Sequence, residues 1–123
     1  MSGPLTGITV LDLTSVISGP LATAILADQG ARVIKVENPS GDSMRMGGAL
    51  NRGVSSLFTA LNRNKDSIVL DLQQESGISA IKSMAASVDI LIQNYRPGVM
   101  ERLGIGYSDL KAINPQLIYV SIN

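Results

Sequence analysis

The stretch "ITVLDLTSVISGPLATAILADQGARVIKVE", residues 8–37, decides the fold. It opens with an apolar run at Ile8–Leu13 and closes with another at Arg32–Glu37, and such short β-branched runs are typical of buried strands. The segment between them is rich in Ala and Leu, with Pro20 suited to a first helical turn and Gly30 to a helix end. This order predicts a β-α-β unit with parallel strands.

The alternation of strand and helix patterns continues to residue 123. Further strands are predicted at Ser67–Leu72, Asp89–Gln93 and 116–122, and further helices at 55–64, 73–88, 96–104 and 107–114. We therefore expect one α/β domain over residues 1–123, a Rossmann-like three-layer sandwich whose mostly parallel sheet has about five strands. The last strand has no helix after it, so we expect missing sequence or a second copy to cover its edge.

The composition excludes several classes of function. Lys plus Arg and Asp plus Glu each number 10, so nothing electrostatic favours a nucleic-acid or membrane partner. The chain has no Cys and no His, which excludes disulfides, Cys/His zinc sites and Ser-His catalysis, and no metal site is predicted. No apolar run approaches the ~20 residues of a membrane span and no signal peptide is recognisable, so we expect a cytoplasmic protein.

Ligands of parallel α/β sheets bind beyond the carboxyl ends of the strands, and the first such connection is Thr14–Pro20. There Gly19 would allow close approach of a phosphate to a helix start, and Ser18 would cap the helix. The dinucleotide pattern G-x-G-x-x-G is absent, so an ordinary connector explains the stretch equally well. Glu37 has the place of a ribose-binding carboxylate, but without that pattern a surface glutamate is the better interpretation.

The segment around the third predicted strand contains two kinds of candidate. Arg63 and Lys65 precede the strand, away from the expected cleft, so we interpret them as a solvated basic turn. Leu70 and Leu72 lie near the strand's exit, where they fit either an adenine pocket or the core.

The Gly-rich segment 39–48 follows the second strand at the ligand end of the sheet. Asp42 and Arg45 on it suit a lid or substrate loop. A disordered surface loop is the slightly favoured alternative, since long polar loops are often mobile.

The stretch "NYRPGVMERLG", residues 94–104, is a candidate phosphate grip. Arg96 precedes the predicted helix, where N–H groups and a guanidinium could both meet a phosphate, and Arg102 follows six positions later. Asn94 and Tyr95, at the end of the fourth strand, could hydrogen-bond and stack a ligand. A plain alternative is that Arg102 pairs with the neighbouring glutamate or faces water.

Taken together, "GARVIKVE.P.GD..R", "NRNK.SI.LDL" and "NYRPGVMERLG" resemble, in order and spacing, the N-terminal part of the family III CoA-transferases. That family includes formyl-CoA and carnitine CoA-transferases and the related α-methylacyl-CoA racemases. The resemblance covers essentially the whole chain. It implies a Rossmann-like CoA-binding domain, with CoA or acyl-CoA as a substrate and no tightly bound cofactor.

Carried over by position, the resemblance implies a set of CoA-binding residues. The first loop would line the adenine or ribose side of the nucleotide, and the exit of the third strand would contribute one apolar contact. The fourth loop would bind the nucleotide and its phosphates. These residues are Val16, Ile17, Ser18, Leu70, Asn94, Tyr95, Arg96, Val99 and Arg102. Two positions depart from the basic residues that some members carry, Asn38 after the second strand and Gln73 after the third, and Arg45 is a possible substitute.

The resemblance also implies what this chain lacks. Family members are roughly three times as long and form interlocked dimers, and their acylated Asp and the racemases' His-Asp pair lie beyond residue 123. We therefore expect no catalytic residue in this chain and no transferase activity from it alone, which leaves open whether it is an enzyme. The interpretation is a CoA-binding fragment of a transferase. The alternative is a free-standing CoA- or nucleotide-binding module that self-associates as a homo-oligomer.

Overall fold

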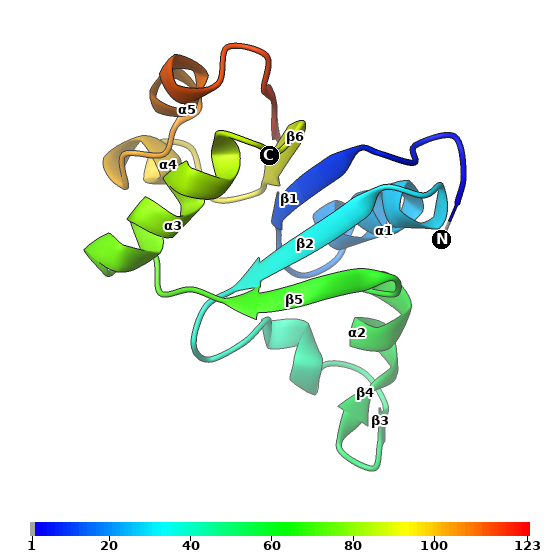
Figure 1. Cartoon of the computed structure of the whole chain (residues 1–123). Helices are drawn as coiled ribbons and strands as arrows, with labels where there is room; N and C mark the ends of the chain where they lie inside the picture. Colours follow the sequence, from blue (N-terminus) through cyan, green and yellow to red (C-terminus); the bar gives the residue numbers. More distant parts are fainter. Residues whose placement is uncertain (1) are drawn as a thin grey trace.

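The computed structural model describes residues 2–123, and its centre is a five-stranded sheet in the order β5-β2-β1-β6-β7 (Figure 1). All four neighbouring pairs of strands are parallel. The strands are β1 (Thr9–Leu13), β2 (Arg32–Glu37), β5 (Lys65–Val69), β6 (Ile90–Gln93) and β7 (Ile118–Ser121). The predicted parallel sheet of about five strands is confirmed.

Helices cover both faces of this sheet. They are α1 (Ser18–Asp28), α2 (Ser56–Leu61), α3 (Glu75–Ala85), α4 (Val99–Arg102) and α5 (Tyr107–Ile113). On one face Leu11 packs in a cluster with Ile81 of α3 and Leu110 of α5. On the other face Val10 packs with Ala27 of α1. Because helix layers lie on each side, the three-layer sandwich is also confirmed.

The face beneath α1 is divided into an apolar half and a charged half. Alternation along each strand sends Val10 and Val33 to this face near the amino ends, where they join the apolar cluster. The same alternation places ionisable side chains on this face as well. In β1 and β2 they lie nearer the carboxyl ends of the strands, and in β5 the side chain lies over α2. These side chains are Asp12, Lys35, Glu37 and Lys65, and all are almost completely withdrawn from solvent. Buried charges need partners, so this half must contain a paired network.

The strand order places a topological switch point between β1 and β6. From β1 the chain runs through α1 to β2 on one side, whereas β6 leads through α4 and α5 to β7 on the other. Ligands of open parallel sheets bind in the crevice at such a point. The loops 14–17 and 94–98 therefore flank the position where a ligand is expected.

The third predicted strand lies two residues earlier than the apolar run suggests. We expected Ser67–Leu72, and the structure has Lys65–Val69, paired from Val33↔Lys65 to Glu37↔Val69. Lys65 can begin the strand because its charged end is paired inside the protein, which the hydrophobic pattern does not reveal. Leu70 and Leu72 consequently lie beyond the strand, half-buried beside the main core.

The segment 38–54 has more structure than the predicted flexible loop. It contains the 3₁₀ turn η1 (Ser43–Met46) and a two-stranded ribbon of β3 (Leu50–Asn51) and β4 (Val54–Ser55). The Asp42 side chain accepts the N–H of Met44 at 2.9 Å, and this cap fixes the start of the turn. The expectation of a disordered surface loop is therefore wrong for this part of the chain.

One predicted helix cap is also wrong. Ser18 is the first residue of α1, and the preceding position, Ile17, makes no side-chain cap hydrogen bond. At the start of α5 the Asp109 carboxylate accepts the N–H of Gly106 at 3.0 Å. Gly30, with φ of 103°, does end α1 as predicted.

Candidate functional site

The switch point is bridged by a single side chain. The Asn94 side-chain oxygen accepts the N–H of Ser15 at 3.1 Å, and its amide nitrogen donates to the Ser15 carbonyl at 2.9 Å. Next to Ser15, Val16 has a φ of 73°, a left-handed conformation that a β-branched residue adopts only under strain. Asn94 thus holds together the two loops that sequence reasoning selected, and its polar atoms are already occupied by Ser15.

A cavity of about 450 Å³ lies beside this bridge, at the carboxyl ends of β2 and β5. Three of the predicted CoA-binding residues, Leu70, Tyr95 and Val99, line it together. The remaining lining residues are Val36, Asn38, Pro39, Ser40, Asp71, Leu72, Gln73 and Leu103. Among them Leu72 is the other residue that we expected either in an adenine pocket or in the core. Asn38 and Gln73 in this set are the two positions where the chain departs from a basic residue. Both departures therefore fall on the wall of the cavity.

Tyr95 is the central residue of the region. It lines the main cavity, a recess of about 90 Å³ toward Lys35 and a recess of about 200 Å³ toward Arg96. Its backbone N–H donates to the Gln93 side chain at 2.8 Å, which fixes the turn after β6. Burial raises the pKa of the Tyr95 phenol, so the ring stays neutral and its hydroxyl remains a hydrogen-bond donor.

The two predicted phosphate-binding arginines are both exposed. Arg96 lines the recess of about 200 Å³, and the guanidinium of Arg102 lies against Gly98. Within residues 2–123 neither arginine forms an ion pair, so Arg102 does not pair with Glu101. Helix α4 has only four residues, which is shorter than predicted, so helix N–H groups add little and the guanidinium groups are the available anion ligands.

The other predicted residues lie on the loop next to the switch point. Val16, Ile17 and Ser18 are exposed and are not part of the cavity wall. Gly19, which we expected to admit a phosphate, is buried and packs against Thr14, where an added Cβ would lie 2.3 Å from the Thr14 Cβ. The glycine is needed for the contact between the helix and the loop, which explains it as an ordinary connector.

Lys65 is buried beneath α1. Its ammonium lies 3.0 Å from an Asp12 oxygen and donates to the Pro20 carbonyl at 3.0 Å and the Asn62 side chain at 2.9 Å. Asp12 also accepts from Thr23 at 2.6 Å. Burial lowers the pKa of Lys65, and Asp12 opposes that effect. The predicted solvated turn holds for Arg63, which pairs with Asp28 at the surface, but it is wrong for Lys65.

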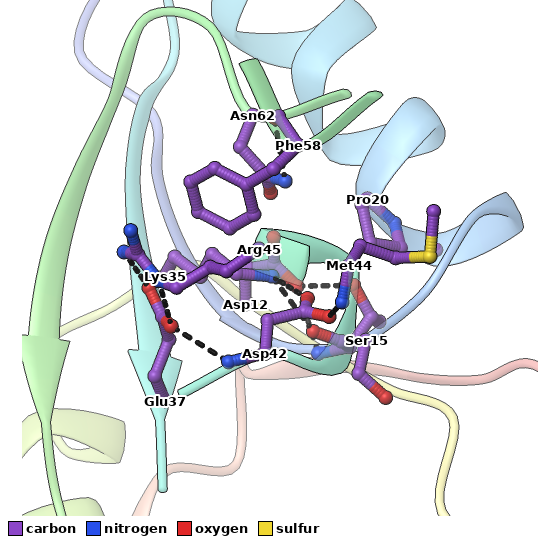
Figure 2. A network of polar contacts seen from close by, with 12 residues as sticks. Asp12, Ser15, Pro20, Lys35, Glu37, Asp42, Met44, Arg45, Phe58 and Asn62 are labelled. Carbon is purple, nitrogen blue, oxygen red and sulfur yellow. Dashed lines mark hydrogen bonds and ion pairs between the residues drawn. The ribbon is translucent and has the colours of Figure 1, made fainter. Parts of the chain in front are cut away.

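Glu37 is likewise buried, with a side chain 2% exposed. Both its oxygens bind Arg45, at 2.6 and 2.8 Å (Figure 2). One of them also accepts from the Ser67 hydroxyl at 2.9 Å. The Arg45 guanidinium lies 4.1 Å from the centre of the Phe58 ring. The hydrogen bonds from Arg45 hold the pKa of Glu37 down to about 2. The predicted surface glutamate is therefore wrong, and Arg45 is engaged by Glu37 instead of standing free for a phosphate.

Comparison with known proteins decides the family. The model of "CoA-transferase family III" matches residues 5–123. The chain belongs to CoA-transferase family III. Acetyl-CoA:oxalate CoA-transferase of Acetobacter aceti is 48% identical over 97% of this chain, and human succinyl-CoA:glutarate CoA-transferase is 45% identical over 97%. The crystal structure of a CAIB/BAIF family protein from Brucella suis superimposes with a TM-score of 0.94 at 40% identity, over the whole of this chain.

These family III relatives are much longer than the chain described. It spans 31% of the Acetobacter transferase, 28% of the human one and 34% of the Brucella chain. The predicted resemblance to an N-terminal portion of a family III CoA-transferase is confirmed. In residues 2–123, no helix has both the length and the hydrophobicity to cross a membrane.

Proposed function

We propose that this chain is the CoA-binding part of a family III CoA-transferase, folded as one domain over residues 1–123. Acyl-CoA thioesters are the substrates that the family implies. The observation that carries the proposal is the shared cavity of Leu70, Tyr95 and Val99 beside the switch point, which brings two residues of the stretch 94–104 together with one that follows β5. Their convergence at the place where open parallel sheets bind ligands supports a nucleotide site.

The chemistry of the cavity suits the parts of CoA. Leu70 and Val99 offer apolar surface, and the Tyr95 ring offers a stacking face, for the adenine base. Arg96 and Arg102 are exposed, charged and unpaired among the described residues, so their forked donors are available for phosphate oxygens. Val16, Ile17 and Ser18 complete the ribose side, and Asn94 serves the site by fixing the first loop.

The cavity walls supply no group suited to the transfer reaction. Asp71 is the one acidic side chain that lines the main cavity within residues 2–123, and its oxygen accepts the N–H of Gln73 at 3.0 Å. A carboxylate held in its own turn is poorly placed to attack a thioester. We therefore propose that the chain binds CoA and that the covalent chemistry belongs to the rest of the longer protein.

Calorimetric titration tests the proposal, with CoA and with 3′-dephospho-CoA as ligands. The double variant Arg96→Ala with Arg102→Ala should lose at least tenfold in CoA affinity, since charge-assisted hydrogen bonds contribute about 1.5–3 kcal/mol each. A matched control is Arg32→Ala with Arg52→Ala, which removes the same charge away from the cavity and should change the affinity less than twofold. Absence of CoA binding by the parent, or equal affinities of the two double variants, would contradict the proposal.

A second candidate function rests on the edge of the sheet. β7 pairs only with β6 among the described strands, and Ile118 on it is 58% exposed. An open apolar edge favours association with another strand. The alternative is thus a binding module that assembles through β7. Sedimentation should then show an oligomer that Ile118→Lys disrupts, whereas a strict monomer at high concentration excludes this function.

A further inference from the structure

The segment that follows β2, residues 38–47, contacts the sheet through the buried carboxylates of Glu37 and Asp42. Glu37 accepts the backbone N–H of Asp42 at 2.8 Å and binds Arg45 (Figure 2). Asp42, in turn, reaches back to the ammonium of Lys35, with 2.9 Å between its Oδ2 and Nζ. Residues 38–47 therefore owe their position to charges held beneath them, because no strand of the main sheet includes them.

Asp42 depends on Lys35 in particular. The two side chains are 2% and 1% exposed. One Asp42 oxygen accepts the N–H of Met44, whereas Oδ2 is buried and accepts no hydrogen bond from the described residues. Lys35 supplies the one cation within 4.0 Å of that oxygen in residues 2–123, so the contact is an ion pair by distance. Without Lys35 the carboxylate would be buried and uncompensated, and the loop would have to move to hydrate it.

The same ammonium contacts the first loop. Lys35 Nζ donates to the Thr14 carbonyl at 3.1 Å, one residue before the Ser15 that Asn94 holds. One buried group thus joins the loops that follow β1 and β2. Thr14 and Asp42 both line the recess of about 90 Å³, which shares Val36, Asn38 and Tyr95 with the main cavity. The distance between these loops therefore determines the shape of the cavity wall.

We propose that Lys35 is a positioning residue of the ligand site: it fixes the first loop against residues 38–47 and so shapes the recess beside Tyr95. Its side chain is too deeply buried to contact a ligand, and it acts through Thr14 and Asp42. The ligand is the nucleotide part of CoA, so this inference rests on the proposed function. Sequence reasoning treated Lys35 only as part of a strand, because the strand pattern does not show that its ammonium lies under the loops.

The experiment compares CoA titrations of four proteins at a temperature well below their unfolding: the parent chain, Lys35→Met, Lys35→Met with Asp42→Asn, and Val10→Ala. The single Lys35 variant should bind CoA at least tenfold more weakly. The double variant should recover part of the affinity, since it leaves no unpaired buried charge. Val10→Ala destabilises the same face of the sheet without touching either loop, and should bind within twofold of the parent.

Hydrogen exchange gives a readout that does not require CoA. The N–H groups of Asp42, Met44 and Ser15 should exchange at least tenfold faster in Lys35→Met than in Val10→Ala. If Lys35→Met does not fold, CoA affinity and amide exchange rates are compared between the double variant and Val10→Ala instead. Equal CoA affinities and equal exchange rates in the Lys35 and Val10 variants would overturn the proposal, as would a double variant no better than the single one. If exchange is accelerated in Lys35→Met but the chain binds no CoA, the role of Lys35 in joining the two loops is supported and only the proposed CoA-binding function is rejected.

Discussion

Asn94 binds Ser15 with both polar atoms of its side chain, across 79 positions of sequence. The two residues lie near the starts of the loops 14–17 and 94–98, which flank the switch point between β1 and β6. This one side chain therefore joins the two loops beside the candidate cavity. The stretch that opens with Asn94 contributes Tyr95 and Val99 to the cavity wall and also holds the first loop in place.

Replacing Asn94 with Ala should weaken CoA binding severalfold and lower the free energy of unfolding by about 1–2 kcal/mol, because two hydrogen bonds and the position of the first loop are lost. Asn114→Ala is the matched control. That side chain likewise bonds only to backbone, donating to the carbonyls of Ala85 and Val88 and accepting the N–H of Gln116, but away from the cavity. Urea unfolding and calorimetry should show similar losses of stability in both variants and lost affinity in the Asn94 variant only. Equal affinities would show that the bridge does not shape the site.

Lys65→Met should be among the most destabilising substitutions in the chain. It leaves the Asp12 carboxylate buried without its ion-pair partner, and breaking such a pair costs about 3–5 kcal/mol, a large part of the ~5–15 kcal/mol that holds a domain folded. Arg32→Ala breaks the exposed pair with Asp66 and should cost at most about 1 kcal/mol. Urea midpoints measure both effects. A small loss for Lys65→Met would contradict a stabilising ion pair between Lys65 and Asp12.

The acid stability of the protein should depend on Glu37. Its pKa is about 2 in the folded state against an ordinary value of 4.5, so the folded state binds this proton less readily than the unfolded chain. The resulting stabilisation is complete above pH 4.5 and is lost as the pH falls through 2. Urea titrations between these limits should show a steeper loss of stability in the parent than in Glu37→Gln. Parallel profiles would contradict the assignment.

The two neutral positions on the cavity wall give a gain-of-function test. Asn38→Arg and Gln73→Lys each place a cation where some family members carry one, and each should raise CoA affinity by about three- to tenfold, close to the ~1 kcal/mol of a new polar contact. Asn51→Arg, on the exposed ribbon, adds the same charge elsewhere and should have no effect. Equal affinities for the cavity variants and the Asn51 variant would indicate that the phosphates lie elsewhere.

Hydrophobic periodicity was enough to predict the sheet, because β1, β2 and β6 are short apolar strands whose burial follows directly from composition. It was not enough for the charged half of the α1 face. Hydrophobic patterning predicts that charged residues such as Lys65 and Glu37 are exposed. Both are instead buried, with partners from distant segments. Partners far apart in sequence leave no local periodic signal, so the third strand was placed two residues late.

The candidate site was predictable to the extent that the family motifs mark it. Leu70, Tyr95 and Val99 converge on one cavity as expected. The motifs also contain Val36, Pro39, Asp71, Leu72 and Leu103 of the wall, but a motif does not show that these residues meet at one cavity. Residues 38–40 belong to the loop that the buried Lys35 and Glu37 hold through Asp42 and Arg45. The roles of Gly19 and Asn94 were also beyond sequence, since one packs against Thr14 and the other binds Ser15.

Nuclear magnetic resonance titration of the ¹⁵N-labelled chain with CoA tests whether CoA binds at this cavity. The largest amide shifts should occur at Leu70, Tyr95, Val99 and the loop of Val16, and they should be lost in the Arg96→Ala, Arg102→Ala variant. Shifts centred on the β3–β4 ribbon or on the free edge of β7, or no shifts at millimolar CoA, would contradict binding at this cavity.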